Sequence, residues 1–215
     1  HYLDELSTRT GLTFAVDGVD VALLPMPSIA VSNASVQGKG LHFSVAYATL
    51  RPDFTALLRG AFEPRAISLL RPRLRGALPL PLGDPEALAG RFGGGDGVLP
   101  GLPDDCRMTI VQGEMDLTGA DGARLQADSL QCRLDTEAPA RVSGRMLLGA
   151  VLWRRPGAPL IRLDNLVLEG ESDLRNPLTA TPRLLVSGAL RWPPHLKQFR
   201  LALNFQAAST GWTAR

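Results

Sequence analysis

Apolar side chains recur at nearly every second position along most of this chain, and this period constrains the fold more than any other feature of the sequence. The stretch VDGVDVALLPMPSIAVSNASV, residues 16–36, shows the pattern. A period of two sends alternate side chains to opposite faces of a β-strand, so that one face is buried and the other is wet. Pro25 and Pro27 interrupt the pattern, as prolines do at strand junctions and sheet edges.

Strands are therefore expected through most of the chain, at residues 12–16, 19–24, 28–37, 41–51, 63–74, 106–118, 123–135, 140–149, 160–170, 181–192 and 198–206, with a last one near Trp212. The dipeptides Asp17-Gly18 and Asp121-Gly122 each predict a tight hairpin, because both central positions of a type I′ turn accept positive φ. Within residues 41–51, one strand phase holds Leu41, Phe43, Val45 and Tyr47.

Short helices are expected near residues 1–9, 53–59 and 85–91. Asp53 precedes a short helical stripe as a cap, and Gly60 suits the position after its last turn. Residues 1–9 fit the tail of a helix that starts upstream, or a frayed terminus. Pro and Gly are dense from residue 75 to residue 104, which we interpret as an irregular connection.

Glycines interrupt several predicted strands, at Gly113, Gly144, Gly170 and Gly188. Such glycines mark bulges or bends, which curl a sheet. We predict a mainly β fold: a curved, largely antiparallel β-meander that forms a groove, with a few short helices. Residues 1–74, the connection 75–104 and residues 105–215 would together form one domain.

Composition and motifs argue against several function classes. The formal net charge is +2 and the arginines are scattered, so nucleic-acid binding is not indicated. No apolar run approaches the ~20 residues of a membrane-spanning helix. The histidines His1, His42 and His195 are far apart, and no metal, nucleophile-elbow or Walker motif is present. We expect no enzymatic activity, metal or cofactor.

Two cysteines lie on the apolar phase of successive predicted strands, Cys106 with Met108 and Cys132 with Leu130. In an unbulged register they are not opposite, but a bulge near Gly113 or Ser129 would bring them together. A disulfide would fit an oxidising compartment. Two buried free thiols are the other interpretation.

The first seventy-odd residues resemble the N-terminal domain of the AsmA family, bacterial envelope proteins related to bridge-like lipid-transfer proteins. The resemblance lies in residues 16–36 and in LRPDFTALLRGAFEPRAISLLRPRL, residues 50–74. It implies an inner-membrane helix upstream of this sequence, a location on the periplasmic face of the inner membrane of a Gram-negative bacterium, and a role in phospholipid transport or outer-membrane assembly.

Two functions remain open at this point. In the first, the apolar face lines a groove for phospholipid or another acyl-chain ligand. In the second, the same face is a closed core, and the domain is a scaffold that binds other envelope proteins. The candidate groove residues share the apolar phase of their strands: Val21, Leu23, Val31, Phe43, Val45, Met108, Ile110, Leu130, Met146, Leu184, Val186, Leu201 and Leu203.

Overall fold

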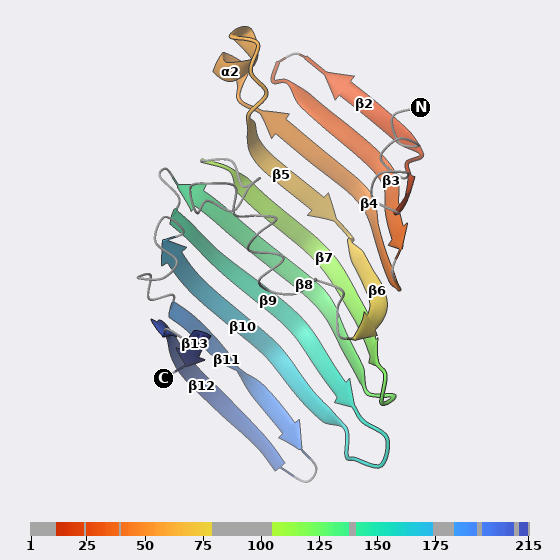
Figure 1. The fold of residues 1–215 in the computed structure, drawn as a ribbon, viewed down its shortest axis with the longest axis vertical. Helices are drawn as coiled ribbons and strands as arrows, with labels where there is room; N and C mark the ends of the chain where they lie inside the picture. The colour runs from red at the N-terminus through yellow and green to blue at the C-terminus, as the bar shows by residue number, and fades with distance from the viewer. Residues whose placement is uncertain are drawn as a thin grey trace.

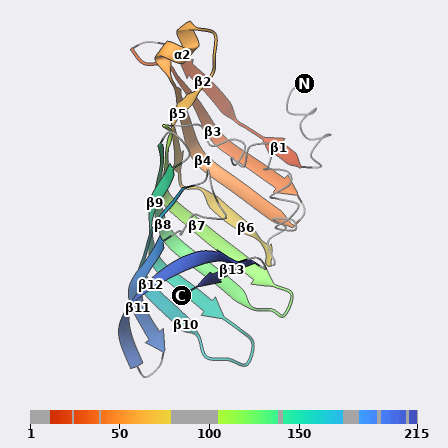
Figure 2. The ribbon, with the colours of Figure 1, turned by 60° about the vertical axis from the view of Figure 1, so that its left-hand side comes forward.

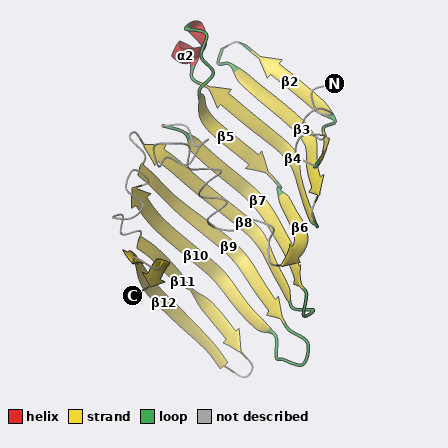
Figure 3. Cartoon of the chain, in the orientation of Figure 1, coloured by secondary structure: helices red, strands yellow, loops and turns green. Residues whose placement is uncertain are grey.

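The computed structural model describes residues 12–23, 25–38, 40–78, 105–137, 141–173, 183–192, 195–208 and 211–214. The described chain is mainly β, as predicted (Figures 1 and 3). Its strands are β1 (Thr13–Ala15), β2 (Gly18–Ala22), β3 (Ser28–Gly38), β4 (Leu41–Pro52), β5 (Pro64–Leu70), β6 (Arg73–Leu78), β7 (Arg107–Gly119), β8 (Arg124–Glu137), β9 (Arg141–Arg154), β10 (Ile161–Asp173), β11 (Arg183–Trp192), β12 (His195–Ala208) and β13 (Gly211–Ala214).

The strands form one large sheet in the order β1-β3-β4-β5-β7-β8-β9-β10-β11-β12-β13. Two positions in this order are shared: β1 and β2 both pair with β3, and β5 and β6 both lie between β4 and β7. From β7 onward each strand pairs antiparallel with the next, as a meander does. The pairs β5–β7 and β6–β7 are parallel.

The sheet is strongly curved. Figure 2 shows the strands curling toward one side, which is the side that faces the reader in Figure 1. Few large side chains are buried within it. The buried hydrophobic residues of the described chain are Ala30, Val45, Ala56, Cys106, Leu117, Ala123, Ala127, Cys132, Leu148 and Ala150. The core is therefore thin, as expected where a single sheet has no second layer among the described elements.

One of the two predicted hairpins forms. The Asp121-Gly122 segment joins β7 to β8 as predicted, and the Gly119 amide donates to the Ala123 carbonyl at 2.6 Å. The turn is not of type I′, because Gly122 takes φ 76° but Asp121 does not have a positive φ. The hairpin predicted at Asp17-Gly18 is wrong. Because β1 and β2 both pair with β3, residue 17 is a bend between two strands on the same edge.

The predicted helix after Asp53 is present as α2 (Phe54–Leu58). The Asp53 carboxylate accepts a hydrogen bond from the Ala56 amide at 2.7 Å and so caps the first turn. Gly60 takes φ 78°, which suits the residue that follows the last turn. The helices expected at residues 1–9 and 85–91 lie outside the described residues.

The boundaries expected at residues 75–104 need one correction. Residues 75–78, expected to be irregular, belong to β6, because Ala77 lies opposite Thr118 in the parallel ladder with β7. The rest of that connection, residues 79–104, lies outside the described chain. Strand pairing is continuous from β4 through β5 and β6 to β7, so the sheet crosses the expected boundary between residues 74 and 105 without interruption.

A line of bulges crosses the middle of the sheet. Its backbone signature is a left-handed conformation at residues that are not glycine: Asn33, Arg71, Gln112, Ser129 and Asn165. The register shifts between Ile110 and Met115 in the β7–β8 pair, and between Asp164 and Val167 in the β10–β11 pair. The predicted bulge at Gly113 is therefore present. Gly144 and Gly170 instead lie opposite each other in an unshifted register.

Candidate functional site

One face of the sheet carries unbroken rows of apolar residues. Residues paired across a sheet stand on the same face, so the register defines these rows. The first row is Val19, Val31, Ala48, Leu69, Ile110, Cys132, Met146, Leu168, Val186 and Leu201. The second row is Val21, Ile29, Leu50, Ile67, Met108, Leu134, Gly144, Gly170, Leu184 and Leu203. Each row holds only apolar residues and glycine across ten strands.

A third row lies beyond the line of bulges. Its members are Phe14, Val36, Phe43, Leu74, Met115, Ala127, Val151, Leu163 and Leu190. In β7 the positions that pair with β8 are Ile110, Gly113 and Met115, which are separated by three residues and then by two. A bulge sets two residues of one strand against one residue of its partner. The three-residue separation across the bulge therefore keeps Ile110, Gly113 and Met115 on one face of the sheet. We call the surface of these three rows the apolar face.

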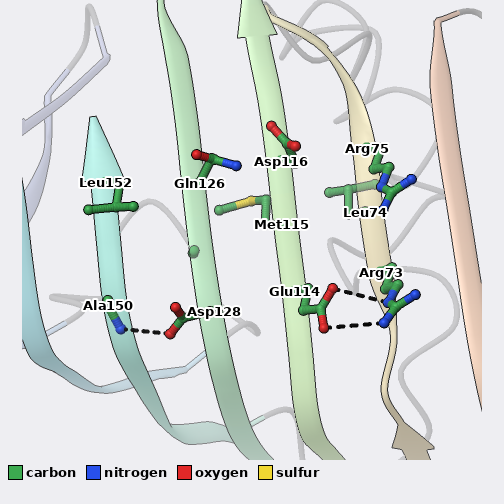
Figure 4. A pocket seen from close by; sticks show the side chains of 11 residues that line it. Arg73, Leu74, Arg75, Glu114, Met115, Asp116, Gln126, Asp128, Ala150 and Leu152 are labelled. Atoms are coloured by element: carbon green, nitrogen blue, oxygen red, sulfur yellow. Dashed lines mark hydrogen bonds and ion pairs between the residues drawn. The ribbon is translucent and has the colours of Figure 1, made fainter. Parts of the chain in front are cut away.

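The apolar face lies on the hollow side of the sheet. In Figure 4 the strand that carries Glu114, Met115 and Asp116 is β7, and it runs upward with β6 on its right. In Figure 1 β7 runs downward, and β6 is again on its right. A rotation within the plane of the page would move β6 to the left of β7, so the two figures view opposite sides of the sheet. The side chains on the near side in Figure 4 include Glu114 and Asp116, which alternate with Met115 along β7. Met115 and its row consequently stand on the side that faces the reader in Figure 1, toward which the sheet curls.

The apolar face is not a sealed core. Its central side chains, such as Ile67, Met108 and Met146, are half-buried. At the two edges the side chains are largely exposed: Val19 by 60%, Val21 by 65% and Leu201 by 50%. A closed core would bring most such residues to a few per cent.

The register brings most of the sequence-predicted groove residues to this face. Val21, Val31, Met108, Ile110, Met146, Val186 and Leu201 belong to the first two rows, and Leu184 and Leu203 occupy register positions in the second. Phe43 belongs to the third row, and Leu130 pairs with Gly113 between the rows. Val45 is buried and pairs with Ala34. Leu23 follows the end of β2, where no pairing assigns it to a face.

Tyr47 does not share the side of Val45, contrary to the phase expected for residues 41–51. It pairs with Leu70, which lies opposite Val111. Their chain neighbours Leu69 and Ile110 belong to the first row, so Leu70, Val111 and Tyr47 stand on the other face. The strand changes phase between Tyr47 and Val45, beside the left-handed residue Asn33 of β3. Strict alternation therefore fails at the line of bulges.

Sequence reasoning also missed residues of the face, notably Ile67, Leu69 and Leu74 on β5 and β6. Their alternation was visible in residues 63–74. What sequence alone did not show is that β5 and β6 sit in the middle of the sheet, between β4 and β7.

The opposite face, here called the polar face, is covered by ion pairs. Examples are Arg107 with Asp135 at 2.7 Å, Arg145 with Glu169 at 3.1 Å, and Arg73 with Glu114 at 3.0 Å. Hydrogen bonds from Arg133 and Arg107 hold the pKa of Asp135 below its ordinary value. These pairs are solvent-exposed, so each adds at most a small stabilisation, but together they keep this side of the sheet hydrated.

A shallow pocket of about 280 Å³ lies on the polar face between β6 and β9 (Figure 4). Its charged side chains include Arg73 and Glu114, which pair with each other, and Asp128, which accepts a hydrogen bond from the Ala150 amide at 3.0 Å. The lining contains no histidine, cysteine or serine. Within the described ranges no group of three His, Cys, Asp or Glu side chains is placed to hold a metal ion.

The two cysteines are not bridged. Cys106 exchanges backbone and side-chain hydrogen bonds with Thr136, whereas Cys132 lies opposite Ile110. The two are thus four residues apart along the ladder, about 13 Å at 3.3 Å per residue, and a disulfide needs Cα atoms within about 7 Å. The anticipated bulges shift the register by too little to close this gap. Both thiols are free and buried, and burial raises their pKa.

None of the described helices is long and apolar enough to cross a bilayer. Comparison of the chain with models of protein families, with curated proteins and with solved structures finds no match.

Proposed function

We propose that the apolar face binds the acyl chains of lipids, and that the chain is a non-enzymatic part of a cell-envelope protein involved in phospholipid transport or outer-membrane assembly. The observation that carries this proposal is the apolar face itself. Three continuous apolar rows line the hollow side of a curved sheet, and their edge residues Val19, Val21 and Leu201 remain at least half exposed. A lipid carrier needs such a surface, because its cargo must enter and leave.

The dimensions of the face suit an acyl chain. At about 4.8 Å between neighbouring strands, the two rows that cross ten strands are about 43 Å wide. The seven residue steps from Met108 to Met115 span at most about 23 Å along the strands. The hydrocarbon of one bilayer leaflet is about 15 Å thick, half of the whole core. A lipid tail therefore fits in either direction, and each methylene that it buries contributes about 0.8 kcal/mol.

The resemblance of residues 16–36 and 50–74 to the AsmA family supports the rest of the proposal. It favours a periplasmic location, attachment to the inner membrane through a helix upstream of this sequence, and contact with other envelope proteins. The ion-paired polar face is compatible with this arrangement, because it would remain in water while the opposite side holds lipid.

Native mass spectrometry of the purified chain tests the proposal, with co-purified phospholipid as the expected finding. The decisive comparison uses two substitutions of similarly exposed residues on opposite faces. Leu201→Glu places a charge on the apolar face and should abolish lipid retention. Val111→Glu places the same charge on the polar face, where the side chain is 39% exposed, and should leave retention unchanged.

The scaffold hypothesis makes the opposite forecast. A folded chain that carries no lipid and takes up none from added phospholipid would contradict acyl-chain binding and favour a protein-binding role. Equal loss of lipid in both variants would also count against the apolar face as the binding surface.

A further inference from the structure

One end of the sheet carries large apolar side chains that stand in solvent. They are Leu23, Met26, Phe54, Leu58 and Phe62, and their exposure runs from 52% at Phe54 to 73% at Leu58. Leu23 and Met26 belong to the connection between β2 and β3, and the other three belong to α2 and the loop that follows it. We call these five residues the tip.

The register shows that the two segments of the tip are neighbours. Ala22 pairs with Ser28 where β2 turns into β3, and Ile29 pairs with Leu50 near the end of β4. Pro52 pairs with Pro64, so residues 53–63 leave the sheet at that same end. Figures 1 and 2 both show α2 beside this end of β2. Pro27 and Pro52 are buried below the tip, so its apolar side chains project from a packed base.

Several backbone amides of the α2 segment are satisfied by hydrogen bonds within the segment. The amides of Arg59 and Ala61 donate to the Ala56 carbonyl, and that of Gly60 donates to Leu57. The amide of Asp53 donates to Glu63 across the base of the loop at 2.6 Å. Unpaired backbone groups are what makes an irregular segment costly in hydrocarbon. These bonds lower the cost of placing this segment in an apolar medium.

The charges around the tip sum to a small positive value. Residues 51–65 hold three arginines against one aspartate and one glutamate, and residues 23–27 hold no charge at all. The carboxylate of Asp53 is occupied by Arg65, whose Nε lies 2.7 Å away. Arg51 and Arg59 are exposed beside the apolar side chains. Apolar residues flanked by cations favour an interface with anionic lipid.

The chemistry of the tip fits a bilayer better than a protein surface. Residues 23–27 read LLPMP and have no side chain that forms a directional hydrogen bond. Specific protein interfaces rely on about one hydrogen bond per 100–200 Å². The side chains of this segment supply none, and liquid hydrocarbon requires none. We propose that the tip inserts into the surface of a bilayer that contains anionic phospholipid, with Arg51 and Arg59 at the level of the headgroups.

Flotation with vesicles tests this proposal. The 215-residue chain should float with vesicles of three parts phosphatidylcholine to one part phosphatidylglycerol. Met26→Asp and Leu58→Asp, which lie in separate segments, should each lower the partition coefficient about tenfold or more, because each replaces an apolar side chain that the bilayer would bury. Both residues are exposed, so both variants should keep the fold, as circular dichroism would verify. Arg59→Gln should weaken binding to these mixed vesicles and leave binding to pure phosphatidylcholine unchanged.

Leu160→Asp is the matched control. Leu160 is 40% exposed and lies between β9 and β10, at the opposite end of the sheet, so this variant should float like the unaltered chain. Unchanged flotation of Met26→Asp and Leu58→Asp, or no flotation of the unaltered chain, would overturn the proposal. A dimer that Leu58→Asp dissociates in the absence of lipid would also overturn it, because a second copy would then cover the tip. Leu201→Glu should still float, which separates this proposal from acyl-chain binding by the apolar face.

Discussion

Four strand residues hold a left-handed backbone conformation although they are not glycine: Asn33, Gln112, Ser129 and Asn165. All four have polar side chains, and asparagine is among the residues that tolerate this region best. Each lies on the line of bulges, where β3, β7, β8 and β10 change phase. The local conformation of single polar residues thus determines which face the rest of a strand presents.

The side chain at Asn165 tests this link between conformation and register. Asn165→Val should lower the free energy of unfolding by about 1–2 kcal/mol, because a β-branched side chain is strained at positive φ. Asn165→Gly should change it less, since glycine adopts φ 51° without strain. Urea unfolding measures both. Equal destabilisation by valine and glycine would mean that the asparagine side chain, and not the backbone conformation, matters.

The free cysteines make a second prediction at this scale. Cys106 and Cys132 are buried and their pKa is raised, so the reactive thiolate is scarce and poorly accessible. In the folded chain both should react slowly with a maleimide, and both should react rapidly in denaturant. Mass spectrometry of the oxidised and reduced chain should give one mass. An intramolecular disulfide that forms without loss of the fold would contradict the register of β7 against β8.

Among the elements, α2 depends on a single capping residue. Asp53 accepts hydrogen bonds from Thr55 Oγ1 and from the Ala56 amide, and it pairs with Arg65. The hydrogen bonds from Thr55 and Arg65 hold the pKa of Asp53 well below its ordinary value. The carboxylate therefore stabilises the loop only while it is ionised.

The decrease in stability at low pH, here called the acid limb, tests this role. A carboxyl group whose pKa is lower in the folded chain contributes its full stability at pH values well above its unfolded pKa of about 3.9, and loses this stability progressively as the pH falls through that value toward the lower pKa of the folded chain. Stability of the chain should thus decrease from about pH 5 downward. Asp53→Asn should reduce stability at neutral pH and make the acid limb shallower. Thermal unfolding at a series of pH values measures both effects, and an unaltered acid limb would show that the cap contributes little.

The sequence predicted the strands better than their partners. Period-two alternation located nearly every described strand, and Asp121-Gly122 identified its hairpin, because both signals are local. Asp17-Gly18 carried the same local signal, yet β1 and β2 lie end to end along β3. The longer strand β3 pairs with both β1 and β2 along one edge. The residues of a turn do not indicate such pairing with a strand further along the chain.

The candidate site was predictable to a similar extent. Apolar phase alone identified residues such as Val31, Ile110 and Val186, which the register then aligns in one row. It failed at Tyr47, because the phase changes at the line of bulges. It also missed the tip, since exposed residues such as Met26 and Leu58 look in sequence like ordinary core positions, and only their place at the end of the sheet leaves them in solvent.

At the scale of the whole molecule, one sheet has to satisfy two opposite environments. Its polar face is held in water by exposed ion pairs such as Arg145 with Glu169. Its apolar face buries only a few residues almost completely, among them Val45 near the line of bulges and Leu117 toward the β7–β8 hairpin. Positions on the same face therefore differ in what they contribute: the buried ones support the fold, and the half-exposed ones leave surface for a ligand.

A charged substitution at a buried position and another at a half-exposed position of the apolar face should distinguish residues that support the fold from residues that leave surface for a ligand. Val45→Glu puts an unpaired carboxylate at a site that is 5% exposed, and it should lower the free energy of unfolding by about 3 kcal/mol or more. Leu201→Glu puts the same group at a half-exposed edge, where water can solvate it, and should change the free energy of unfolding by less than about 1 kcal/mol. Urea unfolding followed by circular dichroism measures both. If Leu201→Glu unfolds the chain as readily as Val45→Glu, the edge of the apolar face is part of a closed core, and the surface for acyl chains is lost with it.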